Sequence, residues 1–245
     1  MAEGIAVPRH AMVMAAGRGS RMGTLGSTTA KPMLEVAGTS LIHRCLGQMA
    51  GDGVGEVVVN LHHQADALRR HLAVLARPRI TLSAESTLLD TGGGVVRALP
   101  WLGPDHFMVA NGDGLWQGTP SPFQTLAAAW REEAMDALLL LKPRHDVRGD
   151  TRSAGDYFRD DGGRLQRRPA VRPAPYMYAS VTLYHRRALA DAPDGVFGMR
   201  DLWDRLERRG RLYGAVYAGD WWHLTTPEDL ARANDALASA PDNRP

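Results

Sequence analysis

The feature that most constrains the fold is the alternation of short apolar runs with longer amphipathic stretches. The runs have the length of buried strands, and the stretches between them carry apolar residues at helical spacing. Strands that alternate with helices in this way build βαβ units. The sequence therefore predicts an α/β fold, with a mostly parallel sheet and helices on both of its faces.

The expected elements follow one another along the chain, whose 245 residues fit a single domain. Strands are predicted over 11–15, 56–61, 79–84, 106–110, 137–141, 178–184 and 212–217. Helices are predicted over 40–49, about 64–75, the residues after Gly94, 123–134, 199–208 and 227–237. Pro227, with Thr226 before it as the N-cap, is typical of a helix start. Residues 239–245 are expected to form a frayed tail.

Charge and composition exclude several kinds of partner. The formal net charge of +2 is too small to indicate nucleic-acid binding, and the arginines are spread along the chain. No apolar run reaches the roughly 18 to 20 residues of a membrane span. The N-terminus lacks the pattern of a signal peptide. We therefore expect a cytoplasmic protein without nucleic-acid or membrane partners, and we expect its single cysteine, Cys45, in the core.

A glycine-rich loop follows the first predicted strand, with Gly17-Arg18-Gly19-Ser20-Arg21-Met22 directly after Ala15-Ala16. Glycines let backbone N–H groups approach an anion, and an arginine in the turn donates charge-assisted hydrogen bonds to phosphate oxygens. The loop is not a P-loop, because the Gly-Lys-Ser/Thr ending is absent. It is not a dinucleotide fingerprint either, because Met22 replaces the third glycine. Alone, this turn is weak evidence for phosphate binding.

Lys31 lies ten residues after Arg21 and directly before Pro32, which fixes the backbone. An isolated lysine before proline is usually a solvated loop residue. The whole segment from Val13 to Ile42, however, resembles the signature of the sugar-1-phosphate nucleotidyltransferase family, which has Ala-Ala-Gly-x-Gly-x-Arg-Met, then Pro-Lys-Pro, then Val-x-Gly-x-x-Leu-Ile. The resemblance extends over almost all of residues 10–238, through Ser83-Ala84-Glu85, Leu89-Asp90-Thr91-Gly92-Gly93-Gly94, Asn111-Gly112-Asp113, Gly149-Asp150 and Trp222-His223-Leu224-Thr225-Thr226-Pro227-Glu228.

This resemblance implies a Rossmann-like fold and an enzyme that joins an NTP to a sugar 1-phosphate and releases pyrophosphate. It implies that residues 10–113 form the nucleotide-binding core, in which Arg21 and Lys31 stabilise charge on the phosphates. It also implies that Asn111 and Asp150 contact the sugar substrate. The implied nucleotide contacts are Ala15, Ala16, Gly17, Gly19, Glu85, Thr91, Gly92 and Gly93. Within the family, the short chain most resembles enzymes that use UTP and N-acetylmuramate 1-phosphate, in cell-wall recycling.

The resemblance also implies a metal site, because the family's aspartate at the position of Asp113 binds Mg²⁺. A carboxylate oxygen is the ligand that Mg²⁺ prefers, with phosphates and water as the remaining ligands. The chief departure is His223, where the family usually has a second metal-binding aspartate. Imidazole suits Mn²⁺ better than Mg²⁺, so His223 could bind another metal, bind a phosphate or mark weakened catalysis. Smaller departures are Gly26, Ala30 and Thr225, for Thr, Pro and Gly.

Residues 143–178 are rich in Arg, Pro, Gly and Asp, and Asp160-Asp161-Gly162-Gly163 is typical of a hairpin turn. We interpret this segment as a small β-rich insertion that covers the substrate. Its arginines could bind the phosphate and the lactyl carboxylate of an N-acetylmuramate, although a solvated loop is an equal alternative for each of them. The candidates are six of its eight arginines: Arg144, Arg148, Arg152, Arg167, Arg168 and Arg172.

The sequence is also compatible with three other functions. The nearest is a mannose- or heptose-1-phosphate guanylyltransferase, because Glu85 could accept hydrogen bonds from guanine as well as from a pyrimidine. A nucleotide-sugar-binding protein without turnover is the second, and His223 is the feature that favours it. A dinucleotide-binding oxidoreductase is the third, and the missing third glycine argues against it.

Overall fold

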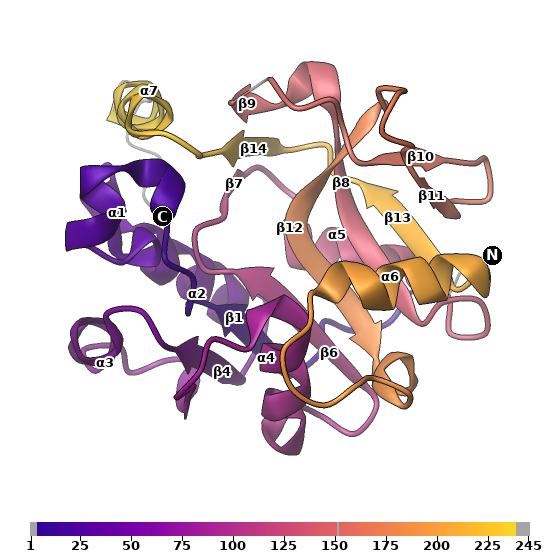
Figure 1. Cartoon of the computed structure of the whole chain (residues 1–245), viewed down its shortest axis with the longest axis horizontal. Coiled ribbons are helices and arrows are strands. Elements are labelled where there is room, and N and C mark those ends of the chain that lie inside the picture. The colour runs from indigo at the N-terminus through magenta and orange to yellow at the C-terminus, as the bar shows by residue number, and fades with distance from the viewer. Residues whose placement is uncertain (1–3, 151, 239–245) are drawn as a thin grey trace.

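The computed structural model describes residues 4–150 and 152–238, and its centre is a nine-stranded mixed sheet (Figure 1). The strands run in the order β11-β10-β12-β6-β1-β4-β5, and β8 pairs with β12 and β13. Their bounds are β1 His10–Met14, β4 Glu56–Leu61, β5 Arg79–Ala84, β6 His106–Asn111, β8 Ala137–Pro143, β10 Tyr157–Arg159, β11 Leu165–Arg167, β12 Tyr176–His185 and β13 Leu212–Val216.

The first half of the sheet is parallel, as the sequence predicts. β1 pairs in parallel with β4 and β6, and β4 pairs in parallel with β5. β13 also pairs in parallel with β8, whereas β12 runs antiparallel to β6, β8 and β10, and β10 runs antiparallel to β11. Parallel strands end at one edge of a sheet, so the residues after β1, β4 and β6 lie close together.

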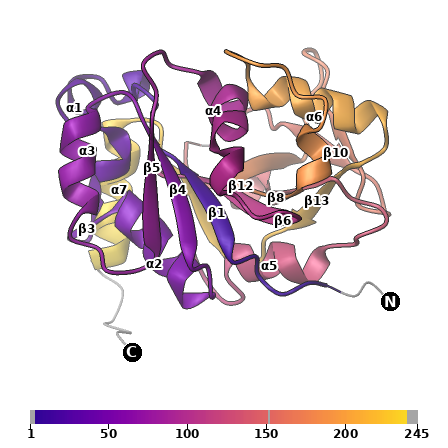
Figure 2. The same ribbon diagram turned by 90° about the horizontal axis from the view of Figure 1, so that it is seen from below.

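Helices cover both faces of the sheet, and alternate residues of each strand pack against opposite layers. Val57 and Val59 of β4 belong to a core with α2 and α5, whereas Val58 belongs to a core with α4 and α6. Figure 2 shows α4 and α6 on one side of the sheet and α5 on the other. The helices are α1 Thr24–Thr28, α2 Leu41–Gly51, α3 Ala65–Leu72, α4 Asp90–Ala98, α5 Pro122–Ala129, α6 Met199–Arg208 and α7 Pro227–Ala238.

Two small sheets and a third core hold the start and the end of the chain together. β7 (Leu115–Gln117), β14 (Asp220–His223) and β9 (Arg148–Gly149) form a three-stranded sheet in the order β7-β14-β9, and β2 (Glu35–Val36) pairs with β3 (Thr39–Ser40). α7 lies beside the segment that contains α1 (Figure 1). The third core is built from Met22, Leu34, Val36, Leu41, Leu115, Trp222, Leu224 and Ala233.

Several predicted elements are confirmed, and two need correction. The hairpin forms, with Tyr157 opposite Arg167, Thr226 accepts a hydrogen bond from the Asp229 N–H at the start of α7, and Cys45 is buried. α4 begins at Asp90 and so includes the glycines that were expected to precede it. α5 ends at Ala129 instead of Ala134, because Trp130 leaves the helix with an extended backbone and buries its ring. The predicted tail lies outside the described residues.

None of the helices in the described part of the chain is long and apolar enough to cross a membrane.

Candidate active site

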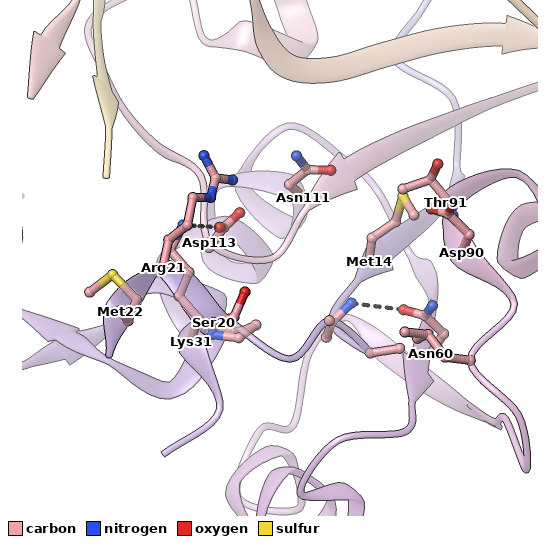
Figure 3. Close-up of a pocket in the computed structure, with 16 residues that line it drawn as sticks. Met14, Ser20, Arg21, Met22, Lys31, Asn60, Asp90, Thr91, Asn111 and Asp113 are labelled. Atoms are coloured by element: carbon pink, nitrogen blue, oxygen red, sulfur yellow. Dashed lines mark hydrogen bonds and ion pairs between the residues drawn. The ribbon is translucent and has the colours of Figure 1, made fainter. Parts of the chain in front are cut away.

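A cavity of about 350 Å³ lies where β1, β4 and β6 end. One wall is the loop after β1, and the other contains Asn60 from β4 and the first residues of α4. Arg21, Lys31 and Asp113 gather on one side of it, and Asn60, Asp90 and Thr91 lie on the other (Figure 3). Ala15, Ala16, Gly17 and Gly19 also line this first cavity. The structure thus brings together most of the residues that the resemblance assigns to nucleotide binding.

The loop after β1 turns tightly at Gly19. This glycine has a φ of 61°, in the left-handed region that glycine adopts without strain. A Cβ on Gly26 would lie 2.3 Å from the Gly19 carbonyl oxygen, which accounts for glycine at a position where the family usually has threonine. Arg21 follows in a short 3-10 helix, is exposed, and has no hydrogen bond or ion pair within residues 4–150 and 152–238. Its guanidinium is therefore free to bind a phosphate.

A buried polar network holds the start of this loop. Asn60 Oδ1 accepts a hydrogen bond from the Ala15 N–H at 2.7 Å, and Asn60 Nδ2 donates to Glu85 Oε1 at 2.8 Å. Glu85 Oε2 accepts from the Leu89 N–H at 3.0 Å. Asn60 and Glu85 are both buried, so the network fixes the loop to β4. Sequence reasoning missed Asn60, although a polar residue within an apolar strand is a detectable signal.

Three residues assigned to the nucleotide pocket do not line the first cavity: Glu85, Gly92 and Gly93. Both Glu85 carboxylate oxygens already accept hydrogen bonds from the protein. The N–H groups of Gly92 and Gly93 donate to the Phe197 carbonyl, and a Cβ on Gly92 would lie 2.2 Å from the Phe197 ring. These three residues therefore lie outside the lining of the first cavity and support the segments that form it, whereas Thr91 lines the cavity.

The Lys31 ammonium group forms an ion pair with Asp113 Oδ2 in the first cavity. Lys31 lies in the 3-10 helix Lys31–Met33, and the Ala30 N–H before it donates to Gln64 Oε1 at 3.1 Å. The alanine that replaces the usual proline thus keeps an N–H that has a partner. Asp113 Oδ1 has no hydrogen-bond partner among the described residues. A partly exposed carboxylate beside a phosphate site fits Mg²⁺, which binds through one or two carboxylates and substrate phosphates.

A second cavity, of about 690 Å³, adjoins the first. The two share Met14, Arg21, Asp90, Thr91 and Asn111. Beyond this shared edge the second cavity is lined by Ser153 and Asp156 from the segment expected to cover the substrate, and by Arg200, Trp203 and His223. Two ligands, one in each cavity, would meet at the shared edge.

His223 and Asp150 lie side by side but differ in their access to the site. The Asp150 N–H donates to the His223 carbonyl oxygen at 3.0 Å. The Asp150 carboxylate accepts from Arg152 Nε at 2.9 Å and from Thr225 Oγ1 at 2.8 Å. The hydrogen bond from Arg152 holds the pKa of Asp150 well below its usual range. Asp150 lines neither of these two cavities, and its contact with the sugar stays a prediction.

The two residues of the predicted metal pair line different cavities. Asp113 lines the first cavity and His223 lines the second, and neither of these two cavities contains both side chains. His223 instead stacks on Trp221, with 5.3 Å between the ring centroids. A set of ligand-type side chains does occur elsewhere in the described residues, at the opposite end of β6. It consists of His106, Glu132 and His185, whose ligand atoms lie within 4.8 Å of one another.

None of the eight arginines of residues 143–178, the six candidates among them, lines the first or the second cavity. Arg148, Arg152 and Arg167 form ion pairs with Asp220, Asp150 and Asp204. Arg172 lies over the Phe158 ring, at 4.4 Å from its centroid. Two other arginines line the second cavity: Arg21, at the edge shared with the first, and Arg200, which the sequence pattern does not single out.

A glycine-rich loop, an exposed arginine and a lysine–aspartate pair at the carboxyl ends of parallel strands define a nucleotidyltransferase site. The chain matches the MobA-like NTP transferase domain over residues 11–226. It therefore belongs to this family, as a sugar-1-phosphate nucleotidyltransferase. Enzymes of the family generally use a divalent metal ion.

Relatives and solved structures agree with this assignment. The chain is 37% identical to N-acetylmuramate alpha-1-phosphate uridylyltransferase of Caulobacter vibrioides, over 95% of this chain and 98% of the relative. It is 27% identical to mannose-1-phosphate guanylyltransferase of Mycobacterium tuberculosis, over 93% of this chain and 64% of the relative. The inositol-1-phosphate CTP transferase from T. maritima has the same fold, with a TM-score of 0.79, 16% identity and 98% of each chain covered.

Proposed function

We propose that the enzyme transfers UMP from UTP to N-acetylmuramate 1-phosphate and releases pyrophosphate. The observation that carries nucleotidyl transfer at this site is the shared edge of the two cavities, where Arg21 and Asn111 line both. The choice of UTP and of this sugar is supported by the end-to-end similarity to the Caulobacter vibrioides uridylyltransferase. The proposed product, a UDP-sugar, is a cell-wall precursor, and in this proposal the reaction is a recycling step in the cytoplasm.

The chemistry follows from two anions that must react with each other. A phosphate oxygen of the sugar 1-phosphate attacks the α-phosphorus of UTP. The new oxygen–phosphorus bond forms as the bond to pyrophosphate breaks, and pyrophosphate leaves with its electron pair. No general base is needed, because the attacking oxygen is already anionic. The protein must position the reactants and stabilise the charge.

Each charged residue of the first cavity has a part in this proposal. Arg21 contacts the phosphates at the shared edge, and Lys31 stabilises charge at the α-phosphate. Asp113 would hold a Mg²⁺ ion, with Mn²⁺ as an alternative, and this ion would supply further charge neutralisation on the phosphates. Asn111, which donates to Ser180 Oγ at 3.3 Å, contacts the sugar phosphate from the end of β6. Residues 143–178 cover the acceptor and limit hydrolysis by water.

The test is pyrophosphate release with UTP, GTP, CTP, ATP and dTTP against a panel of sugar 1-phosphates, in Mg²⁺ and separately in Mn²⁺. Turnover confined to UTP and N-acetylmuramate 1-phosphate would support the proposal. Turnover with GTP and mannose 1-phosphate would correct both substrates, in line with the Mycobacterium tuberculosis relative. If no pair of substrates reacts in either metal, the chain binds nucleotide sugars without turnover.

A further inference from the structure

A third hollow continues from the second cavity and leads away from the first. This outer groove, of about 280 Å³, is lined by Asp156, Tyr157, Arg167, Arg168, Ala170, Tyr178, Arg200 and Trp203. It shares Asp156, Tyr178, Arg200 and Trp203 with the second cavity, and it shares no residue with the first. The three hollows therefore follow one another, and the groove lies at the end that is remote from Lys31 and Asp113.

Arg200 is the free cation at this remote end. It is the second residue of α6, is exposed, and its guanidinium has no hydrogen bond or ion pair within the described parts of the chain. Its two arginine neighbours differ, because Arg167 is paired with Asp204 at 2.7 Å and Arg168 donates to the Ala170 carbonyl at 3.2 Å. An unpaired guanidinium in a hollow is available to bind a carboxylate through two parallel hydrogen bonds.

The charges around the groove favour an anion. Three arginines line it, against one carboxylate, and the Asp156 Oδ2 atom already accepts a hydrogen bond from the Tyr178 N–H at 2.9 Å. Asp201 lines the second cavity but not the groove. Trp203 gives the groove a fixed wall beside Arg200, because its Nε1 donates to the Tyr184 hydroxyl at 2.7 Å.

The reacting phosphate of the acceptor cannot be the partner of Arg200. That phosphate must reach the α-phosphate of the NTP, at the edge where Arg21 lies, and Arg200 lines no part of the first cavity. The anion that Arg200 binds must therefore be a second acidic group on the same acceptor. We propose that Arg200 recognises a carboxylate carried by the acceptor sugar, which makes the enzyme selective for acidic sugar 1-phosphates. This inference rests on the proposed function, since it assigns the acceptor to the second cavity.

The experiment compares two acceptors that differ only in this group. N-Acetylmuramate 1-phosphate carries a lactyl carboxylate that N-acetylglucosamine 1-phosphate lacks. We expect Arg200→Gln to lower the preference for the acidic sugar, measured as the ratio of the two kcat/KM values, by about 10- to 100-fold. Most of the change should be in KM, because Arg200 lies away from the reacting atoms. Arg200→Lys should restore part of the preference, because it restores the charge.

The matched control is Arg208→Gln, which makes the same change at the last residue of α6, outside the three hollows. It should leave the preference unchanged. An equal loss of both acceptors in Arg200→Gln would overturn the inference, and so would an unchanged ratio.

A binding measurement separates this inference from the proposed function. Calorimetry gives the Kd of each sugar phosphate for the wild type and for Arg200→Gln, without any turnover. If neither sugar reacts with UTP, the proposed function fails. Tighter binding of the acidic sugar that is lost in Arg200→Gln would still support the role of Arg200. Equal binding of the two sugars by the wild type would overturn it.

Discussion

The Lys31 ammonium group contacts the Asp113 carboxylate, although 82 positions separate the two residues in the chain. The lysine comes from the segment after the glycine-rich loop, and the aspartate follows β6. The side chains are only 14% and 28% exposed, so each charge is partly removed from water and stabilised by the other. This pair holds the loop against the end of β6. In the proposed reaction the lysine turns to a phosphate and the aspartate to the metal ion.

The pair gives the first prediction. Asp113→Asn keeps the shape of the side chain but removes the charge that holds a metal ion, so turnover should fall on the order of a thousandfold. The measurement is pyrophosphate release over a range of Mg²⁺ concentrations, with circular dichroism to check the fold. Asp161→Asn, at an exposed acid in the hairpin turn, is the control and should keep full activity. Wild-type metal dependence in Asp113→Asn would remove Asp113 from the metal site.

A variant of Glu85 tests whether this residue supports the nucleotide pocket or contacts the nucleotide base. Both of its oxygens accept hydrogen bonds, and glutamine offers only one acceptor oxygen. Glu85→Gln should therefore lower the free energy of unfolding by about 1–3 kcal/mol. The KM values for all NTPs should rise together, with the preference among bases unchanged. Urea denaturation and the NTP panel test this. A switch of base preference at full stability would show instead that Glu85 contacts the base.

Gly92 tests the contact between α4 and the segment before α6. A Cβ at this position would meet the Phe197 ring at 2.2 Å, so Gly92→Ala should cost about 1–3 kcal/mol of unfolding free energy. Gly47, on the exposed side of α2, has nothing within 4 Å of its Cβ position. Gly47→Ala should stabilise the protein by up to about 1 kcal/mol. Thermal unfolding of the two variants compares them, and equal effects would contradict the predicted clash.

The Glu132 cluster predicts how stability depends on pH. Partial burial raises the pKa of Glu132, but hydrogen bonds from Trp130, Arg187 and His106 outweigh this and lower it to about 2. An unfolded glutamate titrates near 4.3, so the folded state binds fewer protons between these values. The stabilisation is complete above the unfolded pKa and is lost as the pH falls toward 2.

Glu132→Gln should therefore flatten the fall of Tm between about pH 5 and pH 3. Glu133→Gln is the neighbouring control, and it should keep the wild-type slope. Parallel Tm curves for the wild type and Glu132→Gln would contradict the low pKa.

The sequence could predict the strands because their apolar runs are dictated by burial within the sheet. It also predicted most residues of the first cavity, since loops at strand ends carry their chemistry in a short stretch. The start of α4 was missed, because three successive glycines indicate a turn. In the structure the N–H groups of Gly92 and Gly93 donate to the carbonyl of Phe197, which is distant in sequence, and the three glycines lie in the first turns of α4.

The acceptor side was the least predictable part of the site. The arginine-rich segment 143–178 attracted attention by composition, but three of the six arginines considered as anion ligands form ion pairs with the protein's own acids. Arg200 has no motif around it, and its position in the second cavity depends on how α6 packs on the sheet. The β7-β14-β9 sheet was also missed, because strands of two to four residues leave no periodic pattern.

The third core has a consequence for how the chain folds during its synthesis. Met22 and Leu34, which flank the segment between the glycine-rich loop and β2, share this core with Trp222 and Ala233. In addition, the Ala37 N–H donates to Asn234 Oδ1 at 2.9 Å. A nascent chain that has emerged only as far as β13 lacks these partners. The nucleotide-binding loop leaves the ribosome early, but an unfinished chain lacks part of the core that packs beside this loop.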